Sequence, residues 1–419
     1  MRILFAHSSF PAQFAHLAAH LGSNPAHDVV FLTSTAARPI PGVKPRIIQA
    51  TRKAAASTHH YLQPLENAVL LGQAAFRECQ KLVSEGFRPD VIYAHAGFGP
   101  GLFLRDAFPN VPLIGYFEWF YRSQRSDADF LAPRGLSADN RLRIRMRNAG
   151  ILTELLQCDL GVCPTAFQRS QFPEEFQRKL VTLHDGVDTE FFRPGEENEV
   201  RQRLPIGELP EDAAIVTYTA RGLEPYRGFP QFMQALALVQ QRNPKVHAVI
   251  AGCDRVFYSP PPPDGTTYKE LMLKRLPQLD RQRLHFVDFL RLNEYRAVLQ
   301  ASAVHVYLTV PFVLSWSLIE AMATGCAIVA SNTAPVREVI EDGASGLLAE
   351  FRSPEAIAGR MMQVLSDADL AHRLGAAARR HAIERFSLAD LLPQQLKLLR
   401  RMAEQDTVGD AGLPNFTKP

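Results

Sequence analysis

The chain alternates between short apolar runs and longer segments in which apolar residues recur with helical spacing. In the first half, the apolar runs are Ile3–His7, Val29–Thr33, Val91–His95, Leu113–Phe117, Leu160–Pro164 and Leu180–His184. Helical spacing is found between them, for example at Gln13–Leu21 and Glu66–Glu85. Strands that are apolar throughout and alternate with helices are typical of parallel sheets covered on both faces. The first half therefore predicts a doubly wound α/β domain.

This alternation stops in a polar stretch and then starts again. Residues 192–212 are polar and contain three prolines and two glycines, which is typical of a connection between domains. The apolar runs that follow are Ile215–Thr219, His247–Ala251, Leu284–Val287, Val304–Leu308, Cys326–Ala330 and Gly346–Ala349. Helical spacing recurs at Phe229–Gln241, Tyr268–Leu276, Asn293–Gln300 and Ser317–Thr324. A second doubly wound domain is the simplest interpretation.

Composition agrees with this architecture and excludes several classes of function. A length of 419 residues suits two domains, and 46% hydrophobic with 21% charged residues is typical of a soluble protein. The net charge of +3 lacks the basic excess of nucleic-acid-binding proteins, so no nucleic acid is expected as a partner. Either a monomer or a homodimer fits.

The cysteines and the length of the apolar stretches indicate the cellular compartment. The five cysteines form no CxxC pair, which favours a reducing cytoplasm over a disulfide framework or a zinc site. The apolar run near the N-terminus is too short for a signal-peptide core, and no apolar stretch has the length that spans a membrane. A cytoplasmic location is therefore expected, with peripheral contact at the inner face of the membrane left open.

Two arginines follow the first strand predicted in the second half. Ligands of open α/β sheets bind outside the carboxyl ends of the strands. There, Arg221 and Arg227 lie on a turn that contains glycine and proline, before a helix begins near Phe229. Such a turn can direct two guanidinium groups at one anion. The alternative is two solvated arginines.

A second loop at this expected edge leads into the N-terminus of an apolar helix. Free N–H groups and the helix dipole attract a phosphate to such a position. Glu320, on this helix, has two possible roles. It can bind a ligand, or it can form a capping box with Ser317, since the two have S-x-x-E spacing.

These stretches together resemble glycosyltransferase family 4. The resemblance lies in Arg221 and Arg227-Gly228, then Pro311-Phe312 and Glu320-Ala-Met-Ala-Thr-Gly325, then Pro335 to Gly346 in PVREVIEDGASG. It implies the GT-B fold, in which two Rossmann-like doubly wound domains face a cleft. It also implies retention of configuration and a nucleotide-sugar donor bound by the second domain.

The resemblance gives roles to residues of the second half. Arg221 and Arg227 correspond to the two cations that grip the donor diphosphate, with Arg227 in the place of a lysine. Glu320 corresponds to the glutamate that binds the ribose hydroxyls. Phe312 stands where the family has a glutamate that touches the donor sugar, and a phenylalanine cannot accept hydrogen bonds from it. The remaining donor-binding residues implied are Gly228, Ser315, Trp316 and Ser317.

In the first half, the resemblance assigns a histidine and an acceptor side. His95 ends a predicted strand and takes the place of the histidine that helps to position the donor sugar. Without the resemblance, a lone histidine that ends a strand is more often a structural residue. Ser9 lies in a loop where the family often has two glycines. The stretch from Tyr116 to Tyr121 combines aromatic rings with Glu118, which suits stacking against an acceptor sugar. Buried aromatic packing is the alternative there. The acceptor-side candidates are Glu118, Tyr121 and Ser9.

Two charged motifs receive other interpretations. Arg141, Arg143, Arg145 and Arg147 spread around a predicted helix, which favours a solvated helix, with anionic lipid headgroups or a lipid diphosphate as the alternative. Asp127-Ala-Asp129 resembles a metal-binding DxD motif, but that motif belongs to a different glycosyltransferase fold. No metal is predicted.

The domain boundaries follow from the pattern and the resemblance together. Residues 1–193 are expected to form the acceptor-side domain and residues 194–386 the nucleotide-sugar-binding domain. The segment Leu183–Pro194 resembles the family's entry into the linker and supports this boundary. Residues 387–405 are predicted to be a helix that packs back on the first domain, and residues 406–419 a disordered tail.

The expected function is retaining transfer of a sugar from a UDP- or GDP-sugar to a glycan, lipid-linked or small-molecule acceptor. The nucleotide-sugar is a co-substrate and no cofactor is expected. One alternative is a GT-B nucleotide-sugar 2-epimerase, against which the loss of the first glutamate argues. The other is a non-catalytic nucleotide-sugar-binding subunit, which Phe312 suggests.

Overall fold

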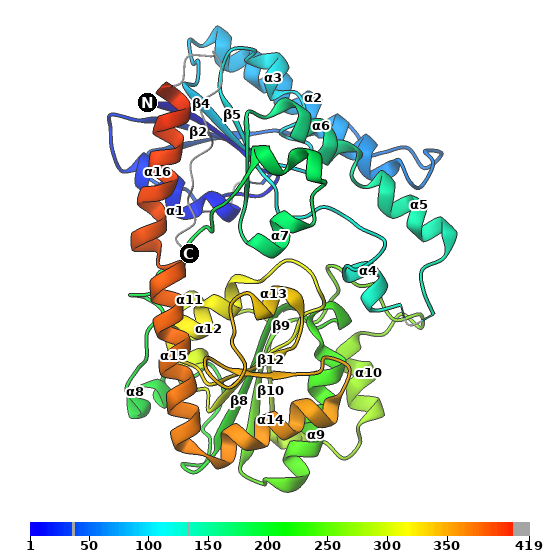
Figure 1. The fold of residues 1–419 in the computed structure, drawn as a ribbon, viewed down its shortest axis with the longest axis vertical. Coiled ribbons are helices and arrows are strands. Elements are labelled where there is room, and N and C mark those ends of the chain that lie inside the picture. Colours follow the sequence, from blue (N-terminus) through cyan, green and yellow to red (C-terminus); the bar gives the residue numbers. More distant parts are fainter. Residues whose placement is uncertain (36–37, 133, 405–419) are drawn as a thin grey trace. The chain divides into compact units, whose positions relative to one another are not determined.

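The computed structural model describes residues 1–35, 38–132 and 134–404, which divide into two compact units. Unit 1 comprises Met1–Gly186 and the chain from Ala389 onward, and unit 2 comprises Val187–Leu388. Each unit is built around one parallel β-sheet (Figure 1). The tail predicted at residues 406–419 lies outside the described residues.

Unit 1 holds a seven-stranded parallel sheet with the strand order β3-β2-β1-β4-β5-β6-β7. Its strands are β1 (Arg2–Ala6), β2 (Asp28–Thr33), β3 (Val43–Ile47), β4 (Val91–His95), β5 (Leu113–Tyr116), β6 (Leu160–Cys163) and β7 (Leu180–Thr182). Its helices are α1 (Ala15–Gly22), α2 (Gln63–Ser84), α3 (Leu104–Ala107), α4 (Asp127–Phe130), α5 (Ala138–Met146), α6 (Ala149–Gln157) and α7 (Ala166–Ser170), joined by α16 (Leu388–Glu404). Because the order reverses between β1 and β4, the carboxyl ends of these central strands are where a ligand is expected.

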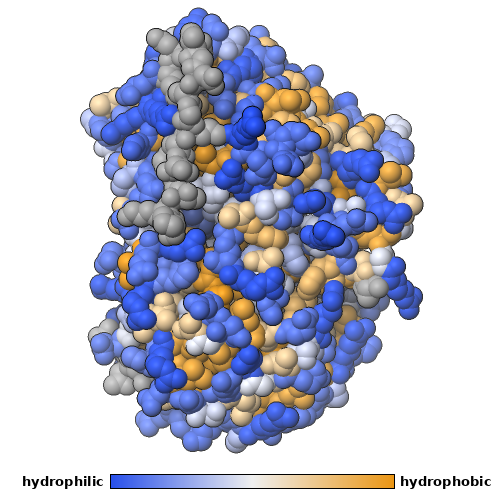
Figure 2. Space-filling model, in the orientation of Figure 1, coloured by the Kyte–Doolittle hydropathy of each residue, from blue (hydrophilic) through white to orange (hydrophobic). Residues whose placement is uncertain are grey.

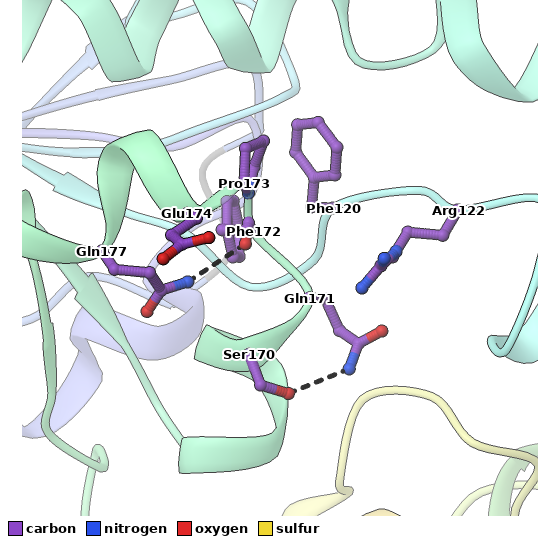
Figure 3. Close-up of a pocket in the computed structure, with 8 residues that line it drawn as sticks. All are labelled: Phe120, Arg122, Ser170, Gln171, Phe172, Pro173, Glu174 and Gln177. Atoms are coloured by element: carbon purple, nitrogen blue, oxygen red, sulfur yellow. Dashed lines mark hydrogen bonds between the residues drawn. The ribbon is translucent and has the colours of Figure 1, made fainter.

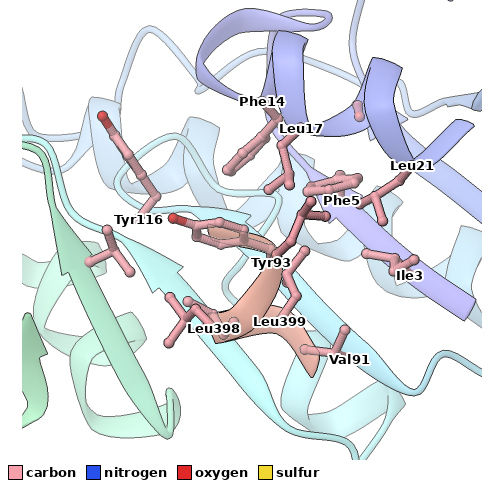
Figure 4. Close-up of a cluster of buried hydrophobic side chains, with 14 of the residues drawn as sticks. Ile3, Phe5, Phe14, Leu17, Leu21, Val91, Tyr93, Tyr116, Leu398 and Leu399 are labelled. Carbon is pink, nitrogen blue, oxygen red and sulfur yellow. The ribbon is translucent and has the colours of Figure 1, made fainter. Parts of the chain in front are cut away.

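Helix α16 completes one face of this sheet. Leu398 and Leu399 are buried in the same apolar cluster as Phe5 of β1 and Tyr93 of β4. Figure 4 shows these side chains packed together. The Gln395 side chain also donates hydrogen bonds to the carbonyl oxygens of His184 and Asp185, at 3.1 and 3.0 Å. Helix α16 is thus part of the hydrophobic core of unit 1.

Unit 2 holds a six-stranded parallel sheet with the order β10-β9-β8-β11-β12-β13. Its strands are β8 (Ala214–Gly222), β9 (Val246–Cys253), β10 (Leu284–Val287), β11 (Val304–Tyr307), β12 (Ile328–Ser331) and β13 (Leu347–Ala349). Its helices are α8 (Glu197–Gln202), α9 (Phe229–Arg242), α10 (Tyr268–Arg275), α11 (Leu292–Gln300), α12 (Trp316–Thr324), α13 (Ala334–Arg337), α14 (Pro354–Ser366) and α15 (Ala368–Phe386). The predicted α/β architecture with two parallel-sheet domains is confirmed.

Two details differ from the sequence prediction. The pattern missed β3, whose sequence VKPRI buries only Val43 and includes Pro45, because an edge strand lacks the apolar run of a central strand. The boundary lies after Gly186 instead of after Arg193. Val187 exchanges backbone hydrogen bonds with Phe386 and Leu388, at 2.8 and 2.9 Å, and this pairing holds the segment to unit 2.

Hydrophilic residues predominate on the face of the molecule drawn in Figure 2. None of the helices in the described part of the chain combines the length and the apolar character needed to cross a bilayer. Among these residues, all five cysteines are free thiols, and four of them are buried.

Candidate functional site

Arg221 lies on the surface of unit 2, at the carboxyl end of β8. Its guanidinium group stacks on the ring of Phe257, with 4.2 Å from Cζ to the ring centroid. Arg255 stacks on the same ring at 4.7 Å. Phe257 therefore holds two exposed cations near the end of β8, and the second of them was not anticipated from the sequence.

Arg227 is the other predicted arginine, and it is almost fully buried. Its Nη1 donates to Thr309 Oγ1 at 2.8 Å, to the carbonyl oxygen of Val313 at 3.1 Å and to Tyr307 Oη at 3.4 Å. No carboxylate in the described chain forms an ion pair with Arg227. A buried charge is normally balanced by an opposite charge, whereas the hydrogen-bond partners of this guanidinium in the described chain are neutral oxygens.

Gly228 shapes the turn that carries Arg227. Its φ of +64° is left-handed, and a Cβ placed there would lie 2.5 Å from Cβ of Leu308. A side chain at this position would therefore both strain the backbone and collide with the strand end. This explains why a glycine separates the buried arginine from helix α9.

The loop before α12 supplies the predicted helix N-terminus. Ser315 is the N-cap residue: its Oγ accepts from the Ser317 backbone N–H at 3.4 Å, and its own N–H donates to Tyr307 Oη at 3.0 Å. Tyr307 thus contacts both Arg227 and the start of α12. Trp316, the first residue of the helix, is 40% exposed.

The capping-box interpretation of Ser317 and Glu320 is wrong. Since Ser315 is the cap, Ser317 lies inside the helix, and its hydroxyl donates to Ser315 Oγ at 2.9 Å. The Glu320 carboxylate instead accepts a hydrogen bond from Tyr295 Oη at 2.9 Å. Burial raises the pKa of Glu320 to about 7, and the hydrogen bond from Tyr295 opposes this rise. Glu320 is thus a perturbed carboxyl group rather than a helix cap.

Phe312 belongs to an aromatic cluster beside Arg227. Its ring packs edge-on against Tyr226 and Tyr258, with centroid separations of 5.5 and 5.1 Å. The rings of Phe312 and Tyr258 lie 5.9 and 5.6 Å from the Arg227 guanidinium. Where the family has a carboxylate, this chain has an apolar wall next to a buried cation.

Glu224 is a structural residue of this site that the sequence analysis overlooked. Its carboxylate is inaccessible to solvent and accepts backbone N–H groups from Phe257, Tyr258 and Ser259, at 3.1, 2.9 and 2.7 Å. It thereby fixes the loop after β9 to the loop after β8. An acidic residue between Arg221 and Arg227 was the available signal, but the pattern could not identify its partners.

In unit 1, His95 ends strand β4 and is buried. Its Nδ1 is 2.9 Å from the carbonyl oxygen of Ala96, whereas its Nε2 has no hydrogen-bond partner among the described residues. Burial holds the pKa of His95 well below its usual range, and His7 lowers it further. Glu118 Oε2 lies 3.8 Å from Nε2, too far for a hydrogen bond. His95 is thus a neutral histidine with one unused ring nitrogen.

His7, at the end of β1, is the neighbour that the sequence analysis did not single out. Its ring meets that of His95 edge-on, with 4.5 Å between centroids. The Ser9 backbone N–H donates to His7 Nδ1 at 2.7 Å, and burial lowers the pKa of His7 to about 4. The predicted residue Ser9 therefore supports His7 through its backbone, while its side chain is exposed.

The acceptor-side candidates Glu118 and Tyr121 occupy different surroundings. Glu118 accepts from Gln13 Nε2 at 3.1 Å and belongs to the cluster around His95. Tyr121 instead carries the Arg147 guanidinium on its ring, 3.7 Å from the centroid. Since this face of the ring is covered, stacking of a sugar on it is blocked.

The DxD-like pair has a structural role. Asp127 is buried and accepts from Ser126 Oγ at 2.6 Å. Asp129 accepts from the backbone N–H groups of Ser126 and Arg125, at 2.9 and 2.8 Å, and forms a capping box at the start of α4. Both carboxylates are thus engaged in holding a short helix.

Two family models match this chain. Residues 25–192 match the model described as glycosyl transferase family 4 group, and residues 201–381 match the model of glycosyl transferases group 1. The two matches meet near the junction of the two units.

Curated relatives include a glycosyltransferase and a synthase. The D-inositol 3-phosphate glycosyltransferase of Geodermatophilus obscurus is 29% identical over 310 residues, which cover 70% of this chain and 62% of that protein. The alpha-maltose-1-phosphate synthase of Mycolicibacterium smegmatis is 33% identical over 235 residues, which cover 54% and 57%. The chain thus spans about three-fifths of the length of these relatives.

Solved structures share the fold over nearly the whole chain. The Anabaena protein HepE, crystallised with UDP and glucose, has a TM-score of 0.68 at 16% identity and covers 96% of this chain and 100% of its own. The sucrose-phosphate synthase of Thermosynechococcus elongatus has a TM-score of 0.70 at 18% identity, with 96% and 99% covered.

Proposed function

This chain belongs to the family 4 glycosyltransferases of the GT-B fold, and from that premise we propose that it uses a UDP- or GDP-sugar as donor. In this proposal it transfers the sugar, with retention of configuration, to a glycan, lipid-linked or small-molecule acceptor. The observation that carries the donor assignment is Arg227, a buried cation that no carboxylate of the described chain neutralises. A diphosphate supplies the missing negative charge.

The residues around Arg227 support a place for each part of the donor. Arg221 and Arg227 face the diphosphate, and the N-terminus of α12 at Ser315 adds backbone dipoles. Glu320, on the same helix, accepts hydrogen bonds from the ribose. The apolar wall of Phe312 and Tyr258 lies toward the sugar, and it offers ring faces where a carboxylate would have offered hydrogen-bond acceptors.

The proposed chemistry is front-face transfer. The acceptor oxygen bonds to the anomeric carbon on the face from which the diphosphate departs, as the bond to the diphosphate oxygen breaks. The electron pair of that bond leaves with the diphosphate, whose oxygen takes the acceptor proton. Arg221 and Arg227 stabilise the charge that grows on the leaving group.

A metal ion is not part of this proposal, because the two arginines carry the positive charge that the leaving group needs. The names of the relatives support the donor and acceptor classes: HepE binds UDP and glucose, and the Geodermatophilus relative glycosylates an inositol phosphate. No cofactor beyond the nucleotide-sugar is proposed.

A thermal-shift panel of UDP-, GDP- and dTDP-sugars tests the donor assignment. A ligand that binds only the folded state raises its melting temperature, so one nucleotide class should stabilise the chain by several degrees. The best donor is then supplied with acceptors, with and without EDTA, and the anomeric configuration of the product is read by NMR. Retention and an unchanged rate with EDTA are expected.

The other outcomes separate the alternatives. If the donor sugar epimerises without any acceptor, the chain is a 2-epimerase. If the donor binds but is neither hydrolysed nor transferred, the chain is a binding subunit. If no nucleotide-sugar raises the melting temperature, the proposed function is wrong.

A further inference from the structure

Unit 1 contains a pocket that the proposed chemistry has not used. It has a volume of about 560 Å³ and lies between the loop after β5 and the segment after α7. Figure 3 shows its lining, which includes Phe120 and Arg122 from the loop and Gln171, Phe172 and Glu174 from the segment. These side chains combine an aromatic surface, a cation, an amide and a carboxylate.

Gln171 is the most informative residue of this pocket. Its side chain is 94% buried, since only 6% of its surface is exposed. Its Nε2 donates to the carbonyl oxygen of Phe167 and to Ser170 Oγ, at 3.2 and 3.1 Å, but its Oε1 accepts no hydrogen bond within the described chain. An unsatisfied buried acceptor costs roughly 1–3 kcal/mol, which a ligand hydroxyl can recover.

Arg122 is the second informative residue. It is exposed, and no carboxylate of the described residues pairs with it. In Figure 3 its guanidinium group extends toward the Gln171 amide. A guanidinium group binds phosphate or carboxylate through two parallel hydrogen bonds. The pocket therefore places an anion-binding fork opposite an unused hydrogen-bond acceptor.

The remaining lining suits a ring with apolar and polar faces. Phe120 is half-buried and provides apolar surface for the C–H face of a sugar or cyclitol, and its ring is supported by the buried ring of Phe172, 5.5 Å away between centroids. The exposed carboxylate of Glu174 can accept hydroxyl hydrogens. A fully charged ligand such as inorganic phosphate would gain nothing from these groups.

The pocket is joined to the histidine cluster within unit 1. Gln168 of α7 donates from Nε2 to the carbonyl oxygen of Glu118 at 2.7 Å. Glu118, whose carboxylate lies beside His95, belongs to the same loop after β5 that carries Phe120 and Arg122. The same short loop thus carries both residues that line the pocket and a residue beside His95, which is expected at the reaction centre.

We propose that this pocket binds the acceptor, and that the acceptor is a hydroxyl-rich ring bearing one anionic group, a phosphate or a carboxylate. Arg122 holds the anionic group, Gln171 Oε1 accepts from a ring hydroxyl, and Phe120 covers the apolar face. This inference rests on the proposed function, because it names the acceptor class of the same transfer reaction.

Direct binding to the full chain, measured by calorimetry without donor, tests this inference. The probes are glucose 1-phosphate, glucose 6-phosphate, inositol 1-phosphate and glucuronate, with glucose, inositol and inorganic phosphate for comparison. At least one anionic ring should bind with a Kd at least tenfold below those of its neutral counterpart and of inorganic phosphate. Binding of the phosphorylated rings would identify the anionic group as a phosphate, and binding of glucuronate would identify it as a carboxylate.

The variants assign this binding to the pocket. Arg122→Gln should lower the affinity for the tightest-binding probe at least tenfold, and Arg122→Lys should recover part of that loss. Gln171→Met should lower the same affinity several-fold. Arg178→Gln removes the same charge from an exposed arginine outside the pocket lining and should leave binding unchanged. Thermal melts of every variant report whether the fold is kept.

Failure of the inference and failure of the proposed function look different. Equal binding of neutral and anionic rings, or equal effects of Arg122→Gln and Arg178→Gln, overturns the pocket assignment. If the unmodified chain binds neither UDP nor GDP, the proposed function is wrong instead. Binding of the acceptor probes can still be measured in that case, because the titration contains no donor.

Discussion

The two units present opposite chemistry at corresponding ends of similar parallel sheets. In unit 2, the ends of β8 and β11 surround Arg227, a buried cation held by neutral oxygens. In unit 1, the ends of β1 and β4 carry His7 and His95, whose pKa values burial lowers so that both rings stay neutral. The same kind of sheet edge thus carries a buried positive charge in one unit and two neutral imidazole rings in the other.

This difference shows that the shared fold sets the position of each candidate site, at the carboxyl ends of the strands, and that the side chains there set its charge. A buried cation without a counter-charge is costly unless an anion binds, whereas a buried neutral histidine can accept a proton or a hydrogen bond from a hydroxyl. We therefore expect substitutions in unit 2 to affect nucleotide binding and substitutions in unit 1 to affect transfer.

Replacement of Arg227 is expected to have the largest effect. Arg227→Ala removes the buried charge that balances the diphosphate, and kcat/KM should fall roughly 10²- to 10³-fold, as for other groups that stabilise a leaving group. Nucleoside diphosphate affinity should fall with it. Steady-state kinetics and calorimetric titration with UDP and GDP measure both quantities.

Arg227→Lys is the matched control for this change. Lysine keeps the charge but lacks the guanidinium nitrogen Nη1, which donates to both Thr309 and Val313, so activity between that of the unmodified chain and that of Arg227→Ala is expected. Near-normal turnover in the alanine variant, with an unchanged melting temperature, would contradict the role of unit 2.

His95→Ala tests the same comparison in unit 1, where it should slow transfer without changing nucleotide affinity. The imidazole lies in unit 1, so UDP or GDP affinity should stay within about twofold of that of the unmodified chain. Transfer should slow by roughly 10- to 100-fold, because the unused Nε2 can no longer position a substrate hydroxyl. Calorimetry and initial rates on the same preparation give the two numbers. Equal losses of affinity and rate would assign His95 a structural role.

The sequence predicted the fold well because central strands and their helices leave strong patterns. β1, β4 and β8 are mostly buried, and each contains a short run that is rich in apolar residues. The edge strand β3 leaves no such run, since four of its five residues face solvent at least in part. Periodicity thus detects buried strands and misses exposed ones.

The sequence proposed residues for the candidate site, whereas the contacts of these residues came from the structure. Arg227 was found because it follows a strand, but no pattern indicated that it is buried among neutral oxygens. The S-x-x-E spacing of Ser317 and Glu320 suggested a cap, and the helix begins one residue before Ser317, so the spacing was coincidental. Gln171 gave no signal, because an unpaired amide oxygen depends on packing between segments far apart in the chain.

Phe312→Leu is expected to have a moderate effect, confined to unit 2. Leucine loses the edge-on contacts with Tyr226 and Tyr258 and leaves a small cavity, which together should lower the free energy of unfolding by about 1–2 kcal/mol. Urea unfolding measures this loss. If the aromatic wall also contacts the donor sugar, discrimination between donors with the same nucleotide should weaken, while UDP or GDP affinity stays constant. An effect on nucleotide affinity alone would place the sugar elsewhere.

The smallest expected effect concerns Glu154, a buried carboxyl group behind the histidine edge of unit 1. Its Oε2 accepts from the Gly97 backbone N–H at 2.6 Å, close to the end of β4. Burial raises its pKa from 4.5 to about 8, and the Gly97 hydrogen bond opposes this rise. Like the two histidines, Glu154 is therefore neutral at pH 7, which extends the contrast with the charged edge of unit 2.

This protonation makes the stability of unit 1 depend on pH. Between pH 4.5 and about 8 the folded chain keeps a proton that the unfolded chain releases, so the free energy of unfolding falls as pH rises. The slope from one such group is at most about 1.4 kcal/mol per pH unit. His7 acts in the opposite direction, but only below its ordinary pKa of 6.5.

Glu154→Gln should therefore flatten the pH dependence of stability above pH 6.5. Glutamine keeps an oxygen for the Gly97 N–H and carries no titrating proton. The unfolding free energy of the variant relative to the unmodified chain should therefore rise by roughly 1.5 kcal/mol from pH 6.5 to 8. Urea midpoints at several pH values measure this difference, with Glu175→Gln, at an exposed position, as the control. Parallel pH profiles for the unmodified chain and Glu154→Gln would mean that Glu154 is ionised in the fold, and unit 1 would then carry a fixed charge behind its histidines.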